Sequence, residues 1–274
     1  MPASIPHLPP FEPALRVLVV DDNELNQLVV CRALEDWNVE ATLADNGRQA
    51  VELVIAQPFD VVLMDIQMPE MDGYEATRRL RSHSHLQLLP IIGLTASASA
   101  QDQAQALQAG MNTTLAKPFD PALLHANLVH YTTQRSTKSA QPSQAGSSTP
   151  EPATEPEIII QPDWTLLEEL AAGNESFIAQ LVTTFLEQTP LLYQQLVAAC
   201  TAGEELALAR LAHKLKGQVV YFGVPAMEYH LEKLERPSTV SDSALPLHRV
   251  EKIGQQLAAL YPYLQHRLDR FQPK

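Results

Sequence analysis

Apolar and polar positions divide the first 131 residues into short apolar runs that alternate with segments of helical periodicity. Five short runs of mainly branched apolar residues begin at residues 16, 39, 61, 91 and 113. These runs predict five strands. Apolar side chains recur every three or four positions in five further segments, which predicts helices over residues 24–37, 48–56, 74–81, 101–109 and 121–130. Strands that are apolar on both faces and alternate with helices are typical of a parallel, doubly wound α/β sheet.

The second half of the chain has a different pattern, without strand-like runs. Helical periodicity predicts helices over residues 164–171, 176–188, 191–202, 204–221, 226–235 and 244–271. Pro190 and Gly203 are expected to break the chain between helices. This region is therefore predicted to be an all-α domain, an antiparallel helical bundle.

Two segments lack any periodic apolar pattern. Residues 1–14 are rich in proline, and we expect them to form a flexible tail. Residues 132–160 consist largely of Ser, Thr, Gln, Pro, Ala and Gly and have too few large apolar side chains to form a core. We expect a disordered linker there, between an α/β domain over residues 15–131 and a helical domain over residues 161–274.

The composition argues against some classes of binding partner and some cellular compartments. The net charge of −13 argues against binding of nucleic acid, whose phosphates attract basic surfaces. No apolar run is long enough to insert into a membrane, and the first residues lack the basic and apolar regions of a secretory signal. Cys31 and Cys200 fall in different domains on helical patterns, as expected of unpaired cysteines in a reducing cytoplasm.

Polar side chains stand where four of the predicted strands end. The residues are Asp21, Asp22, Asp65, Thr95 and Lys117. A single aspartate at a strand end most often caps the following turn or helix. The carboxyl ends of parallel strands meet at one edge of a sheet, however, so these five side chains are expected to lie together. Carboxylates suit Mg²⁺, and a hydroxyl with a lysine suits a phosphoryl group.

These residues and their spacing resemble the signature of receiver domains of two-component response regulators. The text VVDDNE at residues 19–24 and MDIQMPEMDG at residues 64–73 is similar to receivers of hybrid sensor kinases. The resemblance covers about residues 15–131 and implies a flavodoxin-like five-stranded sheet.

The resemblance also implies a role for each residue of this site. Asp65 is implied to accept the phosphoryl group. Mg²⁺ is implied to be held by Asp22, Asp65 and the backbone carbonyl of Gln67, with Asp21 acting through water. Thr95 and Lys117 are implied to contact the phosphoryl oxygens.

In the helical domain, the segment from residue 206 to residue 217 carries candidate chemistry. An apolar stripe at helical spacing consists of Leu208, Leu211, Leu215 and Val219. His213 lies about 200° around the helix from its neighbours in this stripe, and we expect it to point into water. Arg210 and Lys216 flank it, and Gly217 costs about 1 kcal/mol relative to alanine within a helix but leaves room beside the imidazole. The simpler interpretation is a solvated basic face with an incidental histidine.

The run HKLKG at residues 213–217 and the YFG at residues 221–223 resemble histidine-containing phosphotransfer (HPt) domains. The resemblance covers about residues 163–272. It implies a four-helix bundle in which His213 is the phospho-accepting nucleophile, with Lys216 beside it.

Two positions depart from these families. Thr114 stands where receivers usually carry the Tyr or Phe of an activation switch, and Gln218 stands where the phosphotransfer family often has Ser. We expect the second departure to matter little.

The combined hypothesis is a cytoplasmic phosphorelay protein of two-component signal transduction, in which Asp65 and His213 exchange a phosphoryl group. We expect a phosphoryl carrier and not an enzyme, because a kinase of this type needs a second histidine motif and a Gly-rich ATP lid. The expected partners are an upstream histidine kinase and a downstream receiver. One alternative is a Mg²⁺-dependent phosphatase of the haloacid dehalogenase type, which needs an aspartate where this chain has Gln67. Another is a scaffold on which Asp65 only docks a kinase.

Overall fold

The computed structural model describes residues 8–96, 99–133, 161–235 and 244–271. The chain divides into two compact units, Met1–Ala145 and Gly146–Lys274. The boundary between the units falls in the segment for which we expected a linker. Most of that segment, residues 134–160, lies outside the described residues, as do residues 1–7 of the expected tail.

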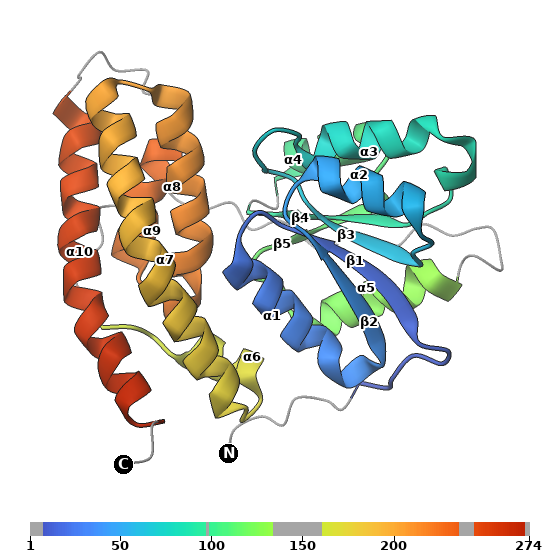
Figure 1. Ribbon diagram of the computed structural model, residues 1–274, viewed down its shortest axis with the longest axis horizontal. Coiled ribbons are helices and arrows are strands. Elements are labelled where there is room, and N and C mark those ends of the chain that lie inside the picture. Colours follow the sequence, from blue (N-terminus) through green and yellow to red (C-terminus); the bar gives the residue numbers. More distant parts are fainter. Residues whose placement is uncertain (1–7, 97–98, 134–160, 236–243, 272–274) are drawn as a thin grey trace. The chain divides into compact units, whose positions relative to one another are not determined.

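The first unit is a five-stranded, fully parallel sheet with helices on both faces (Figure 1). The strands are β1 (Leu15–Val20), β2 (Val39–Ala44), β3 (Val61–Asp65), β4 (Ile91–Thr95) and β5 (Thr113–Ala116), in the order β2-β1-β3-β4-β5. The helices are α1 (Glu24–Leu34), α2 (Gly47–Ala56), α3 (Gly73–Ser82), α4 (Ala100–Ala109) and α5 (Pro121–Thr133), with short 3₁₀ turns η1 (Glu35–Trp37) and η2 (Ser84–Leu86). Helices α2, α3 and α4 cover one face, and α1 and α5 cover the other. The predicted doubly wound α/β fold is confirmed.

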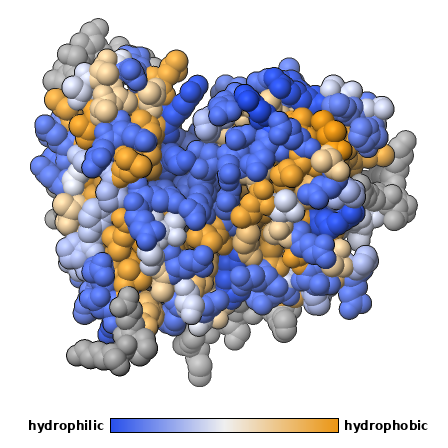
Figure 2. All heavy atoms as spheres, viewed as in Figure 1, coloured by the Kyte–Doolittle hydropathy of each residue, from blue (hydrophilic) through white to orange (hydrophobic). Residues whose placement is uncertain are grey.

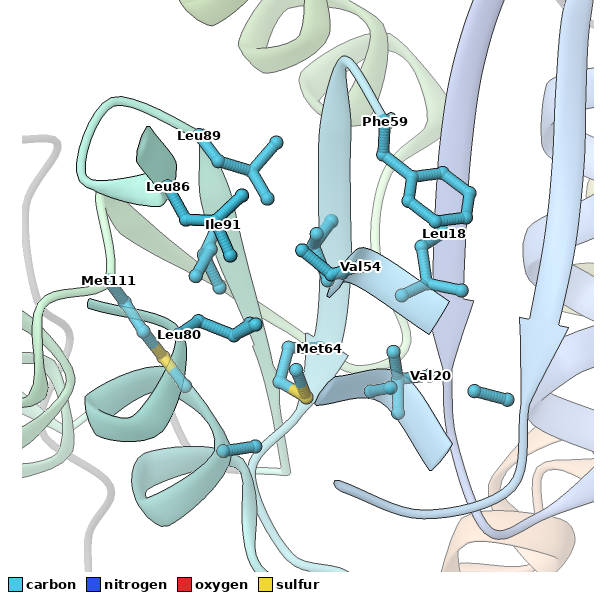
Figure 3. Close-up of a cluster of buried hydrophobic side chains, with 14 of the residues drawn as sticks. Leu18, Val20, Val54, Phe59, Met64, Leu80, Leu86, Leu89, Ile91 and Met111 are labelled. Atoms are coloured by element: carbon cyan, nitrogen blue, oxygen red, sulfur yellow. The ribbon is translucent and has the colours of Figure 1, made fainter. Parts of the chain in front are cut away.

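The central strands are buried on both faces, as their continuous apolar sequences predicted. Leu18 and Val20 of β1 belong to the cluster that packs beneath α2, α3 and α4 (Figure 3). Val17 and Val19 face the opposite side, and all four side chains are inaccessible to solvent. This double burial fixes the strand register, and with it the position of every residue that follows a strand end.

Residues 8–14 do not behave as the flexible tail that we expected, because they pack on the α/β unit. The amide of Phe11 donates to the carbonyl of Trp37 at 2.9 Å. The His125 ring on α5 lies between the rings of Phe11 and Trp37, with centroids 5.0 and 4.9 Å away. Its Nε2 lies 2.9 Å from the carbonyl of Pro9. Aromatic packing and backbone hydrogen bonds therefore fix a proline-rich segment that has no periodic pattern to reveal it.

The second unit is helical. Its elements are α6 (Thr165–Ala171), α7 (Glu175–Ala202), α8 (Glu205–Val219), the 3₁₀ turn η4 (Val220–Phe222), α9 (Pro225–Glu235) and α10 (Ala244–Asp269). Helices α7, α8, α9 and α10 each pack against two of the others and form a four-helix bundle (Figure 1). Short connections join α7 to α8 and α8 to α9, so these consecutive helices run antiparallel.

The break that we predicted at Pro190 is wrong, because α7 continues through it. Proline inside a helix costs about 3 kcal/mol or more. The buried side chains of Phe185, Leu192 and Leu196 lie on both sides of it and pack in the bundle, and we attribute the continuous helix to this packing. Gly203 does end the helix, in the left-handed conformation with φ 71°.

A close approach explains the glycine of the YFG segment. Gly223 has φ 57°, and a Cβ there would lie 2.7 Å from the Cβ of Asp163. The amide of Asp163 donates to the carbonyl of Phe222 at 2.9 Å, which brings the start of the helical unit against the turn between α8 and α9. A glycine therefore satisfies both the backbone conformation and the packing here.

The outer surfaces carry mixed polar and apolar residues on the face that Figure 2 shows. Exposed large apolar side chains are spread over several helices and the turn before β4, and they include Leu88, Leu107, Leu191 and Leu206. Among the described residues, none of the helices has both the length and the apolar character that crossing a bilayer requires.

Candidate functional sites

The structure brings the polar residues of the strand ends together at one edge of the sheet. Asp65 is the last residue of β3 and Thr95 the last of β4, while Asp21 directly follows β1 and Lys117 directly follows β5. Asp21, Asp65 and Thr95 are buried, and Asp22 is half-buried. Parallel strands in this order place their carboxyl ends side by side, which is why residues far apart in sequence meet here.

The Lys117 ammonium group connects two of the carboxylates. Its Nζ lies 2.6 Å from Oδ2 of Asp21 and 3.0 Å from Oδ2 of Asp65. The amide of Lys117 donates to the carbonyl of Thr95 at 2.6 Å, which holds the backbone of Lys117 beside the end of β4. The lysine side chain is only 11% exposed, so its charge acts on the carboxylates with little screening by water.

Two amide side chains that we did not identify from the sequence fix the first acidic loop. Asn26 donates from Nδ2 to Oδ1 of Asp21 at 3.0 Å. Gln27 donates from Nε2 to the carbonyls of Asp21 and Ala44, at 2.7 and 3.2 Å. Both amides are buried in α1, and their only sequence signal was the position of two polar residues on a core-facing part of a helix.

The loop after β3 folds closely around Asp65. The amide of Gln67 donates to Oδ1 of Asp65 at 3.4 Å. The amide of Gly73 donates to the carbonyl of Ile66 at 2.9 Å, and a Cβ on Gly73 would collide with the Asp65 backbone carbonyl. Asp72 then caps α3 by accepting from the amide of Glu75 at 2.7 Å. Asp72 and Gly73 thus start a helix beside the carboxylate.

The acidic trio fits a hard divalent cation. Asp21, Asp22 and Asp65 each offer a carboxylate oxygen, and these oxygens all lie within 4.8 Å of one another. Mg²⁺ prefers oxygen ligands and keeps several waters, so a few carboxylates on an edge partly open to solvent are sufficient.

In the helical unit, His213 does not point freely into water as we expected. Leu208, Leu215 and Val219 of the predicted stripe are buried, but Leu211 is only half-buried. The His213 side chain is 19% exposed, because α9 packs beside α8 and places Glu235 against the ring. A projection of α8 alone does not include this neighbouring helix.

Glu235 contacts two basic side chains of α8. Its Oε1 lies 3.1 Å from Nδ1 of His213, and its Oε2 lies 2.6 Å from Nζ of Lys216. Burial raises the pKa of the Glu235 carboxyl, but the hydrogen bond with His213 and the charge and hydrogen bond of Lys216 outweigh burial and lower the pKa below its usual value. This contact could not be predicted from the sequence, since it depends on how two helices align.

Gln218, which we expected to matter little, lies inside the bundle without solvent exposure. Its Oε1 accepts from the hydroxyl of Thr189 on α7 at 3.3 Å, and its Nε2 donates to Oε1 of Gln188 at 3.2 Å. This polar contact joins α7 to the end of α8, one turn beyond His213.

Comparisons with known proteins divide the chain at the same place. Residues 17–129 match the model of the response regulator receiver domain, and residues 180–271 match the model of the Hpt domain. The signal transduction histidine-protein kinase BarA of Escherichia coli K12 is 34% identical over 227 residues, which are 81% of this chain and 24% of BarA. The sensor histidine kinase GacS of Pseudomonas protegens is 35% identical over 225 residues, with the same coverage of 81% and 24%.

This chain therefore spans about a quarter of the length of the curated relatives that it matches. Among solved structures, the receiver domain of the sensor histidine kinase PA1611 from Pseudomonas aeruginosa PAO1 is 41% identical. It covers 44% of this chain and 98% of its own, with a TM-score of 0.42, and it has a magnesium ion coordinated in its active-site cleft.

Proposed function

Because this chain joins a response regulator receiver domain to an Hpt domain, we propose that it is a phosphorelay protein in which Asp65 and His213 exchange a phosphoryl group. The observation that carries the proposal is the contact of Lys117 with both Asp21 and Asp65 at the edge that also holds Asp22 and Thr95. A carboxylate, a lysine, a hydroxyl and further acids in one small site supply what phosphoryl transfer needs, namely position and charge neutralisation.

At the receiver site, Asp65 is the acceptor. One of its carboxylate oxygens attacks the phosphorus of a phosphohistidine on the donor, and the nitrogen–phosphorus bond breaks with its electrons returning to the imidazole. Lys117 and Thr95 contact the phosphoryl oxygens. Asp22, Asp65 and the carbonyl of Gln67, assisted by Asp21, would hold a Mg²⁺ ion, which would supply charge neutralisation when bound.

At the helical site, His213 takes the phosphoryl group from Asp65 or returns it, and it exchanges with a receiver on a second protein. Arg210 and Lys216 lie on the same side of α8 as His213 by helical spacing and favour the approach of an anion. Gly217, one turn after His213, is proposed to leave room for the incoming receiver.

We propose that the chain is a phosphoryl carrier that receives its phosphate from a histidine kinase. Its two matched regions correspond to acceptor modules and not to an ATP-binding module. We further propose that this exchange occurs in the cytoplasm, without membrane insertion and without nucleic acid as a partner.

A small-molecule phosphodonor with Mg²⁺ tests the proposal on the full chain. The expected result is one acid-stable, base-labile adduct that is absent from Asp65→Asn, followed by an acid-labile adduct that requires His213. Asp72→Asn is the matched control, since Asp72 caps α3 and lies outside the acidic trio. Multiple turnover without an accumulating adduct would instead indicate a phosphatase, and the absence of any adduct would indicate a scaffold.

A further inference from the structure

The side-chain amide of Gln27 joins the ends of two neighbouring strands beside the acidic trio. Gln27 lies near the start of α1, and its Nε2 donates to the carbonyl oxygen of Asp21 at 2.7 Å. The same nitrogen lies 3.2 Å from the carbonyl oxygen of Ala44 and 3.1 Å from Oδ1 of Asp45, at the end of β2. All three partners are oxygen atoms, so only the NH₂ end of the amide can face them.

An amide is an unusual choice for this side of α1, which otherwise faces the core. Val30 and Leu34, one and two turns further along the helix, are buried apolar residues. Gln27 is only 6% exposed, and burying a polar amide costs free energy unless its hydrogen bonds are made. The three oxygens provide these hydrogen bonds, and the buried amide is thereby held between the ends of β1 and β2.

The carbonyl group that Gln27 holds belongs to the peptide bond between Asp21 and Asp22. Because a peptide group is planar, holding its oxygen also restricts the direction in which Asp22 continues the chain. The amide of Asp21 donates to the carbonyl of Ala44 at 3.1 Å, so the peptide groups on both sides of Asp21 are tied to the end of β2. The Asp22 carboxylate lies within 4.8 Å of the Asp21 and Asp65 carboxylates, and this proximity depends on that direction.

We propose that Gln27 is a positioning residue of the divalent-cation site, which directs the Asp22 carboxylate toward those of Asp21 and Asp65. The inference rests on the proposed Mg²⁺ site and adds to it a residue that is not itself a ligand. Mg²⁺ requires nearly octahedral oxygen ligands at about 2.0–2.1 Å, whereas Ca²⁺ accepts more variable arrangements at about 2.3–2.6 Å. A less well directed Asp22 should therefore weaken the binding of Mg²⁺ more than the binding of Ca²⁺.

A purely structural role, in which Gln27 only stabilises the α/β unit, is the competing interpretation. Gln27→Met separates the two, because methionine has a similar length but no N–H donor. Under the structural interpretation the variant loses unfolding free energy, while its folded state binds both cations as the wild type does. Gln27→Asn is a second variant that gives the same test if Gln27→Met does not fold. Its side chain keeps the amide but is one methylene shorter, so its NH₂ falls short of the three oxygens.

Calorimetric titration of the full chain with Mg²⁺, and separately with Ca²⁺, measures both affinities, and Asp65→Asn identifies the heat that comes from this site. We expect the dissociation constant for Mg²⁺ to rise about 10- to 100-fold in Gln27→Met, the usual effect of removing a residue that orients a metal ligand. The constant for Ca²⁺ should rise less. The matched control is Asn112→Leu, because the Asn112 side chain accepts from the amide of Ile91 at 2.8 Å at the opposite edge of the sheet. It should lower the unfolding free energy without changing either affinity.

An unchanged Mg²⁺ affinity in a folded Gln27 variant, or equal losses of affinity for Mg²⁺ and Ca²⁺, would overturn the inference. The titrations contain no phosphate, so they are independent of phosphoryl transfer. If the wild type binds Mg²⁺ through Asp65 but neither Asp65 nor His213 is phosphorylated, the proposed function fails and the result for Gln27 stands. If the wild type binds Mg²⁺ no more tightly than Asp65→Asn, the proposed cation site and the inference both fail.

Discussion

Gly73 approaches the backbone carbonyl of Asp65 so closely that a Cβ on Gly73 would lie inside the 3.0 Å below which such contacts essentially do not occur. Gly73→Ala should therefore displace the loop after β3 and destabilise the α/β unit by about 1 to 3 kcal/mol, the usual cost of overpacking. Denaturant unfolding of the full chain checks this, together with the yield of the Asp65 adduct, which should fall. Arg78→Ala is exposed on the same helix and should change neither quantity.

The ammonium of Lys117 competes with any cation for the carboxylates that it contacts. Lys117→Met removes a positive charge 2.6 Å from Asp21 and 3.0 Å from Asp65. We expect tighter binding of Mg²⁺ by calorimetry, because the carboxylates lose an internal counter-charge, but a loss of the phosphorylated state. Arg78→Met removes an exposed charge elsewhere on the same unit and should leave both measurements unchanged. Weaker Mg²⁺ binding in Lys117→Met would contradict the electrostatic interpretation.

Two glutamates of α9 should respond to pH in opposite directions. The pKa of Glu235 is lowered from 4.5 in the folded protein, so its contribution to stability is present above about pH 4.5 and is lost as the pH falls through the lower folded value. Burial raises the pKa of Glu228, although the charge of Lys216 opposes this, so ionised Glu228 disfavours folding at neutral pH.

Unfolding of the full chain between pH 3 and pH 7 measures the difference. At pH 7, Glu235→Gln should destabilise the helical unit by about 1.5 to 3 kcal/mol, the usual contribution of a hydrogen bond to a charged group. Glu228→Gln should be neutral or stabilising. The two variants should converge with the wild type toward pH 3. Equal losses of unfolding free energy in both variants at pH 7 would contradict this prediction, because they would mean that the two ionised carboxyl groups affect stability in the same way.

The edge of the sheet could be predicted from the sequence because strand ends are local features. The end of each apolar run predicted the position of a polar side chain. The parallel topology then placed Asp21, Asp65 and Lys117 close together. The contacts that orient these groups could not be predicted in the same way. Gln27 reaches three oxygens from two different loops, and no pattern in one helix specifies such distances.

The errors in the helical unit and at the amino-terminal end have a related cause. Pro190 is a local signal to end a helix, and the packing of α7 in the bundle overrides it. Residues 8–14 have no local signal to be ordered, yet Phe11 and His125 pack together. The position of Glu235 against His213 depends on the alignment of α8 with α9. In each case the decisive interaction joins segments that a window along the sequence treats separately.

The segment over residues 134–160, directly after α5, should be the preferred site of proteolysis in the full chain. Its composition does not support a core, and exposed segments of small and polar residues are cut most readily. Limited digestion should leave two stable fragments that correspond to the receiver and Hpt domains, as mass spectrometry can show. Cleavage within α7, around Pro190, serves as the comparison and should be slow. Resistance throughout residues 134–160 would mean that this segment is docked.

The last prediction concerns transfer within one chain. The composition of residues 134–160, which follow α5, predicts a linker, and a flexible chain of 27 residues spans roughly 30 Å. It gives the two sites an effective concentration on the order of mM, which exceeds micromolar concentrations of separate chains by about 10²- to 10³-fold. Transfer between Asp65 and His213 in the wild type should therefore be fast and independent of protein concentration.

Two full-length variants supply the intermolecular comparison. His213→Gln can load only at Asp65, and Asp65→Asn can accept only at His213, so a mixture of the two must transfer between chains. At micromolar concentration the mixture should be slower than the wild type by about 10²- to 10³-fold, and its rate should rise in proportion to concentration. A wild-type rate that also rises with concentration would show that the two sites of one chain do not meet. Each site would then exchange phosphate only with other proteins, because tethering does not accelerate transfer between two sites that cannot come into contact.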